Sequence, residues 1–150
     1  LPVLLKEDGT PFYGEDYTFR YGAIDVVRDG KDAVILSMGH FAGRAVTAHD
    51  FLAAEGISVK VLHCASPLGM DADELFELVG DRPLVTCEDH HVNTGIGSIA
   101  AMMAARAGKA IKLVNLGVTH YGCSGPSNEV MAEMKLSPKD IAEAVKGSLK

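Results

Sequence analysis

The run Ala33-Val34-Ile35-Leu36-Ser37 decides the fold class of this chain, because five uncharged and mostly β-branched or aliphatic residues are typical of a strand covered on both faces. Helix and strand patterns alternate after it. The helix patterns span 43–55, 71–79, 98–107, 129–134 and 137–149, and the strand patterns span 57–62, 84–87 and 111–116. This order predicts a three-layer α/β/α sandwich with a mostly parallel sheet of about five strands.

The segment before this run predicts one antiparallel strand near the N-terminus. Residues 23–28 have strand-like content, and Asp29-Gly30-Lys31-Asp32 supplies turn residues, so we expect a hairpin into the run at 33–37. Near the other end, Ser137 and Pro138 predict the N-cap and the first residue of the last helix. Right-handed crossovers would then place the carboxyl ends of the parallel strands on one edge, where open α/β sheets bind ligands.

The first residues have a different character from the rest. Five of the nine aromatic residues lie between positions 12 and 21, and the chain has no initiator Met. A flexible tail would not be so aromatic. We therefore expect residues 1–18 to be a linker or docking segment, packed on this domain or on a neighbouring one, and residues 19–150 to form the domain. The chain could be a processed form or an excerpt of a longer polypeptide.

Composition excludes several classes of function. The 150 residues include 14 Lys and Arg against 20 Asp and Glu, a net charge of −6, which argues against nucleic acid as a partner. The uncharged stretch 92–105 is too short to cross a bilayer, so we expect no membrane contact. Three cysteines make no disulfide framework, and we expect a cytoplasmic protein. The acidic stretch 71–89 is expected to be a solvated face.

Five histidines follow predicted strands and are the main functional lead. The candidate ligand or interface residues at this edge are His40, His63, Glu88, His90, His120, Gly95 and Gly97. Imidazoles and a cysteine thiolate could form a tetrahedral zinc site, although no local spacing is a metal signature. The alternative is that these histidines cap helices or bond to neighbouring loops. The sequence leaves both interpretations open.

Two other motifs do not fit an enzyme site. Gly95-Ile96-Gly97-Ser98-Ile99-Ala100 matches the glycine pattern of dinucleotide-binding turns, but it lies too far from the preceding strand and lacks the acidic residue about 20 positions later. We expect these glycines to serve a backbone turn, and the alanines at 100, 101, 104 and 105 to let the helix lie close to the sheet or to a partner. Ser124 does not lie between a strand and a helix, as a nucleophile elbow requires.

The order of segments from about Phe19 to Leu149 resembles the C-terminal domain of transketolases. The similar stretches are Phe19-Arg20-Tyr21-Gly22-Ala23, 27–35, 52–59, Ser66-Pro67-Leu68, Leu116-Gly117-Val118, Ser124-Gly125 and, as the most specific, Leu84-Val85-Thr86-Cys87-Glu88-Asp89-His90 followed by Gly95-Ile96-Gly97-Ser98. Gly69 replaces an Asp common in the family, and Thr94 replaces the first of two paired glycines.

The resemblance implies a function for the complete enzyme rather than for this chain. Transketolases move ketol units between sugar phosphates, and their thiamine diphosphate and magnesium lie between the first two domains across a dimer interface. No catalytic, cofactor-binding or metal residue can therefore be carried over to this chain. The implied partners are the N-terminal and middle transketolase domains, on the same or a separate chain, in a homodimeric or heterotetrameric enzyme. The implied role is packing, assembly or regulation, without catalysis in isolation.

Two alternatives remain open. The parent enzyme could be a deoxyxylulose-phosphate synthase or a 2-oxo acid dehydrogenase with a similar domain in its beta subunit. A hypothesis of another class is a small-ligand or metal-binding regulatory module that uses His40, His63, Glu88, His90 and His120.

Overall fold

The computed structural model describes residues 2–150, and Leu1, the first residue of the predicted linker, lies outside the described residues. Five strands form one sheet in the order β1-β3-β2-β4-β5. The strands are β1 (Asp25–Arg28), β2 (Ala33–Ser37), β3 (Val59–His63), β4 (Leu84–His91) and β5 (Leu113–Val118). All neighbours pair in parallel except β1, which runs antiparallel to β3 at one edge. The predicted fold class is confirmed.

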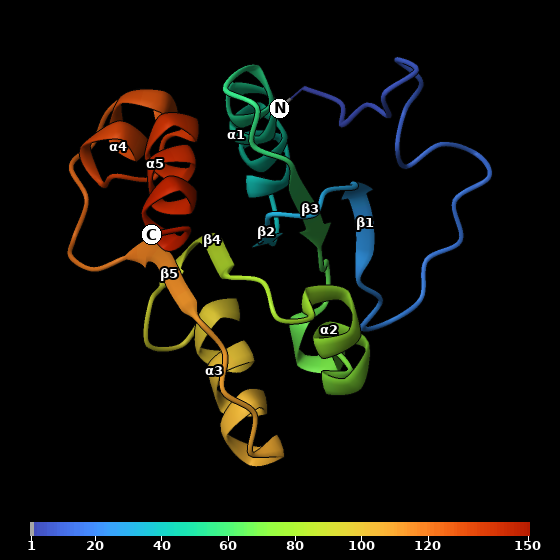
Figure 1. Cartoon of the computed structure of the whole chain (residues 1–150). Helices are drawn as coiled ribbons and strands as arrows, with labels where there is room; N and C mark the ends of the chain where they lie inside the picture. Colours follow the sequence, from blue (N-terminus) through green and yellow to red (C-terminus); the bar gives the residue numbers. More distant parts are fainter. Residues whose placement is uncertain (1) are drawn as a thin grey trace.

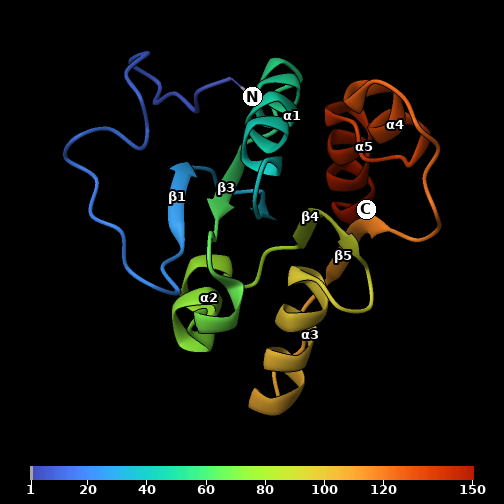
Figure 2. The ribbon, with the colours of Figure 1, turned by 180° about the vertical axis from the view of Figure 1, so that it is seen from behind.

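Helices cover both faces of this sheet (Figure 1), and the view from behind shows the same layers (Figure 2). The helices are α1 (Phe41–Ala54), α2 (Ala72–Val79), α3 (Ile96–Ala107), α4 (Ser127–Glu133) and α5 (Pro138–Ser148), with a 3-10 turn η1 (Pro67–Gly69) before α2. One hydrophobic cluster joins α1 and α5 to one face, and a second joins α2 and α3 to the other. Within residues 2–150, no helix has the length and apolar character needed to span a membrane.

The pairing of β1 differs from the prediction, because β1 forms no hairpin with β2. It lies against β3, with Asp25 opposite His63, and β3 separates it from β2. The reason lies in the residues between the strands. The Asp32 carboxylate accepts a hydrogen bond from the backbone N–H of Ser58 at 2.7 Å, and the backbone N–H of Asp32 donates to the Ser58 carbonyl. These hydrogen bonds hold the 29–32 turn at the start of β3. The strand β1 therefore pairs with the outer edge of β3.

The ends of the elements follow local chemistry. α5 has the predicted start: the Ser137 hydroxyl and the Asp140 carboxylate cap each other's backbone N–H groups, and Pro138 occupies the first turn. β4 and α3 are both longer than the patterns at 84–87 and 98–107 predict, since β4 continues through Glu88-Asp89-His90-His91 and α3 begins at Ile96. The polar residues 88–91, which lie beyond the predicted strand at 84–87, therefore belong to β4.

Residues 2–18, here called the N-terminal strap, pack on this domain. Leu4 and Phe12 lie against the hydrophobic cluster on the α1 side of the sheet. The Arg28 guanidinium donates a hydrogen bond to the Leu5 carbonyl at 2.9 Å. The hydroxyl of Tyr13 donates to the Asp25 carboxylate at 3.1 Å. The strap therefore belongs to the fold, and the proposed boundary after residue 18 stays a prediction.

Candidate functional site

The carboxyl ends of β2 and β4 lie side by side in the middle of the sheet. The chain leaves them in opposite directions, since β2 leads through α1 to β3 and β4 leads through α3 to β5, with α1 and α3 on opposite faces. Ligands of open α/β sheets bind outside such a switch point. The residues that follow the two strands, His40 after β2 and Glu88, Asp89 and His90 at the end of β4, are therefore the first candidates.

Glu88 is fully buried and caps α3. Its Oε2 accepts a hydrogen bond from the backbone N–H of Ile96 at 2.6 Å, and its Oε1 accepts one from Gly97 at 3.1 Å. The N-terminus of a helix carries partial positive charge and would attract the phosphate of a ligand. Here the carboxylate of the chain itself occupies that position. The prediction that the acidic stretch 71–89 is a solvated face is wrong for Glu88.

The two candidate glycines pack against neighbouring side chains. A Cβ on Gly95 would lie 1.8 Å from Glu88 Oε2, and one on Gly97 would lie 2.3 Å from Asn115 Oδ1 and 2.5 Å from Thr86 Oγ1. The Thr86 hydroxyl donates to Asn115 Oδ1 at 3.0 Å. Both glycines thus allow α3 to approach β4 and β5 closely. This arrangement supports close helix packing as their role.

Asp89 joins two of the candidate histidines. Its Oδ2 lies 3.2 Å from His40 Nδ1, and its Oδ1 lies 3.3 Å from His90 Nδ1. His90 Nδ1 also lies 3.8 Å from Glu88 Oε2. These contacts tie the start of α1 to the end of β4. The part of the chain that the structure describes has no group of three or more His, Cys, Asp or Glu side chains placed to hold a metal ion, so the geometry offers no support for the zinc hypothesis.

His63 and His120 lie apart from this group. His120 is about half exposed on the loop after β5, and its Nε2 pairs with Glu133 Oε1 of α4 at 3.5 Å. His63 ends β3 and is 5% exposed. The structure therefore links His40, Glu88 and His90 by short contacts, in part through Asp89. His63 and His120 make no such contact with them.

The surroundings of His63 contain polar residues that the sequence did not single out. Ser37 Oγ lies 3.1 Å from His63 Nδ1 and donates its proton to the Leu62 carbonyl at 3.0 Å. Burial lowers the pKa of His63, and the nearby carboxylate of Asp25 opposes this shift. Ser37 is fully buried, so it orients the imidazole and offers no accessible nucleophile. Its position as the polar last residue of an apolar strand was the available signal.

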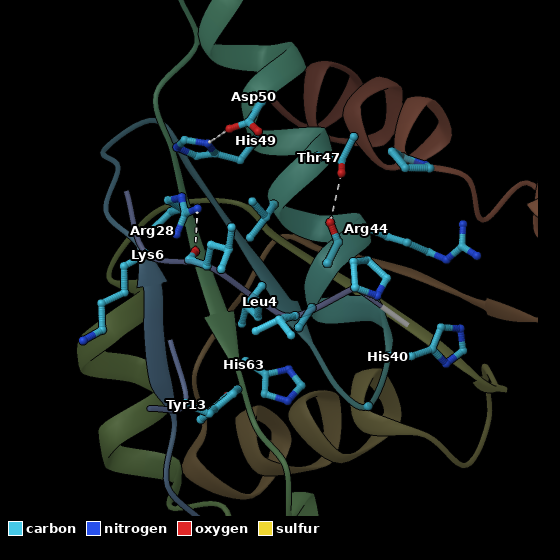
Figure 3. A pocket seen from close by; sticks show the side chains of 18 of the residues that line it. Leu4, Lys6, Tyr13, Arg28, His40, Arg44, Thr47, His49, Asp50 and His63 are labelled. Atoms are coloured by element: carbon cyan, nitrogen blue, oxygen red, sulfur yellow. Dashed lines mark hydrogen bonds and ion pairs between the residues drawn. The ribbon is translucent and has the colours of Figure 1, made fainter. Parts of the chain in front are cut away.

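A cavity of about 1090 Å³ lies between the strap, the first turns of α1 and the end of β3 (Figure 3). Its lining includes Tyr13, Arg28, His40, Arg44 and His63. Sequence reasoning missed this cavity because the strap, which forms one wall, is irregular and gives no periodic signal. Arg44 belongs only to the helix pattern at 43–55, and Arg28 entered the sequence analysis only as part of a strand pattern and of the similar stretch 27–35.

Comparisons with known proteins give a consistent family. The model of the "Transketolase, C-terminal domain" family matches residues 22–141. An apulose-4-phosphate transketolase subunit from Actinobacillus succinogenes is 33% identical over 125 residues, which are 81% of this chain and 40% of that protein. The 1-deoxy-D-xylulose-5-phosphate synthase of Geobacillus thermodenitrificans is 31% identical over 141 residues, 92% of this chain and 22% of that enzyme.

A solved structure adds the three-dimensional comparison. A split-gene transketolase, described as an inactive beta4 tetramer, superimposes with a TM-score of 0.83 at 29% identity. The match covers 91% of this chain and 45% of that one. The chain thus spans less than half the length of the relatives that it matches.

Proposed function

This chain belongs to the transketolase C-terminal domain family, and from that premise we propose that it is the packing and assembly domain of a transketolase-type enzyme. The complete enzyme transfers ketol units between sugar phosphates. Its N-terminal and middle domains, on the same or a separate chain, hold the reacting groups, and the assembly is a homodimer or a heterotetramer. The short span relative to its relatives supports this proposal.

One observation carries the proposal that this chain does not catalyse alone. Its glycine-rich turn at a helix N-terminus, the place best suited to a diphosphate, is filled by the buried Glu88 carboxylate. The described residues also offer no metal-ligand group for magnesium. The glycine-rich turn therefore leaves no room for a diphosphate at the N-terminus of α3. We place the cofactor in the other domains of the complete enzyme.

Isothermal titration calorimetry tests whether the cofactor binds to the other domains rather than to this chain. Thiamine diphosphate with magnesium, titrated into the purified chain in the presence of excess inorganic phosphate, should give no saturable binding heat. The N-terminal and middle domains of the parent enzyme, produced as a second polypeptide, should co-elute with the chain in size-exclusion chromatography and gain ketol-transfer activity from it. Tight stoichiometric cofactor binding by the chain alone would contradict the proposal, as would full activity of the second polypeptide without the chain.

The similarity to a deoxyxylulose-phosphate synthase supports a second candidate parent. A 2-oxo acid dehydrogenase with a similar domain in its beta subunit is a third. An assay of the complete enzyme decides between them, because a transketolase takes a ketose phosphate as donor, whereas the other two classes take a 2-oxo acid. We also place the protein in the cytoplasm, a proposal that the three free cysteines support, since thiols stay reduced there.

A further inference from the structure

The N-terminus of α1 opens into the cavity beneath the strap without a cap. His40 occupies the N-cap position in a helical conformation, its side chain makes no capping hydrogen bond, and the first turn contains no acidic residue. The backbone at Gly39, Ala42 and Gly43 lines the cavity. The free N–H groups of a first helical turn carry partial positive charge. This charge therefore faces the cavity, whereas Glu88 neutralises the corresponding end of α3.

His63 is an independent feature of the same cavity. The imidazole is 5% exposed and lines the cavity beside Tyr13 (Figure 3). With the hydroxyl proton of Ser37 directed to the Leu62 carbonyl, we assign the ring proton of His63 to Nδ1, which then donates to Ser37 Oγ. Its Nε2 then carries a lone pair, and within residues 2–150 this atom has no hydrogen-bond partner. The cavity wall thus presents an acceptor without a donor.

The charges of the lining favour an anion. Arg28 is 8% exposed, and its guanidinium donates to the carbonyls of Val27 and Leu5. No carboxylate of the described residues lies within 4.0 Å of it, although buried cations are usually paired. Buried nitrogen atoms of His40 and Arg44, namely Nε2 and Nε, also lack partners among residues 2–150. The lining also contains Lys6, Glu7 and Asp50, so its cations exceed its carboxylates by one, in contrast to the net charge of −6 of the whole chain.

We propose that this cavity binds a phosphate monoester, with the phosphate oxygens at the uncapped N-terminus of α1 and a phosphate hydroxyl donating to His63 Nε2. A monoester has its second pKa near 6, so at about pH 6 half of it carries both anionic oxygens and a proton to donate. An ionised carboxylate has no such proton and leaves the His63 acceptor unsatisfied. The proposal concerns a site outside the cofactor cleft and does not rest on the proposed assembly function.

Nuclear magnetic resonance of the 150-residue chain tests the site with inorganic phosphate as the probe. The amide signals of Ala42 and Gly43 and the ring nitrogen signals of His63 should shift saturably on titration. Acetate, which lacks the donor proton, should bind at least tenfold more weakly. The variant H63N keeps an amide nitrogen where Nδ1 contacts Ser37 but removes Nε2, and it should weaken phosphate binding about tenfold.

A second pair of variants separates the site from general charge effects and covers the case in which H63N does not fold. R44Q removes a cation of the cavity lining, and R106Q removes an equal charge from the exposed last turn of α3. R44Q should weaken phosphate binding about tenfold, and R106Q should leave it unchanged. The proposal is overturned by the absence of saturable shifts in the wild-type chain, by equal losses in R44Q and R106Q, or by acetate binding as tightly as phosphate.

Discussion

Glu88 Oε2 lies 2.6 Å from the backbone nitrogen of Ile96, and this contact joins the end of β4 to the first turn of α3. A carboxylate placed there satisfies helix N–H groups that have no partner within the helix. It also fills the position where a phosphate would bind in a dinucleotide-binding turn. One buried side chain therefore stabilises the helix and excludes one class of ligand.

Replacing Glu88 with Gln should lower the free energy of unfolding by about 1–3 kcal/mol. A neutral amide keeps one acceptor oxygen but directs an NH2 group toward a backbone N–H of α3, so one charge-assisted hydrogen bond becomes a contact between donors. Urea unfolding followed by circular dichroism measures the change. E77Q, on the exposed face of α2, is the matched control and should lie within experimental error of the wild type. Equal stability of all three proteins would refute the capping role.

Gly97 should not tolerate a methyl group. The Cβ of G97A would lie 2.3 Å from Asn115 Oδ1, so either the helix or this side chain must move, at a cost of about 1–3 kcal/mol. G147A is the control, because no atom lies within 4 Å of the added Cβ, and alanine favours a helix by up to about 1 kcal/mol over glycine. Thermal unfolding should move in opposite directions for the two variants, and a stabilised G97A would contradict the packing.

His63 should make stability depend on pH. Burial lowers its pKa in the folded state below the ordinary value of 6.5, so below that pH the unfolded chain binds a proton that the folded chain does not. The free energy of unfolding should therefore fall as the pH drops through 6.5 toward the folded-state pKa. Urea unfolding at several pH values, in phosphate-free buffer, measures this slope. H63N should show a shallower slope, and identical slopes would rule out the assigned environment.

The three cysteines should differ in reactivity. Cys64 and Cys87 are buried, and burial raises the pKa of both thiols, whereas Cys123 is exposed on the loop after β5. A thiolate-specific reagent such as Ellman's reagent should therefore modify one thiol quickly in the folded chain and all three after denaturation. C123S should abolish the fast phase. Fast modification of two or more thiols in the native protein would show that the core opens readily.

Much of the fold follows from local patterns in the sequence. The apolar runs at 33–37 and 84–87 predicted buried parallel strands, because only strands covered on both faces lack polar alternation. The Ser137 and Pro138 pair predicted the start of α5 through local capping chemistry. The predictions failed where contacts between residues far apart in the sequence determine how strands pair. The 29–32 turn appeared to close a hairpin, yet the Asp32–Ser58 hydrogen bond, across 26 residues, places β1 beside β3.

The candidate site was likewise predictable only in part. Sequence position alone placed His40, Glu88 and His90 at one sheet edge, because parallel strands end together. It could not show that Asp89 bridges the two histidines, nor that His63 faces Ser37 and the cavity, because these contacts depend on strand order and side-chain direction. The cavity itself needs the strap, which has no periodic pattern.

The α/β class, the family resemblance and the edge of the sheet on which polar residues gather can all be read from the order of the amino acids. These properties come from period, turn chemistry and residue order, which are local. Only the folded chain shows that Glu88 is a buried cap of α3 and that the N-terminus of α1 has no side-chain cap and lies at the cavity under the strap. The physical reason is that the partner of a helix N-terminus can come from a distant part of the chain, as Glu88 of β4 does for α3, so only the folded chain shows which helix ends have one.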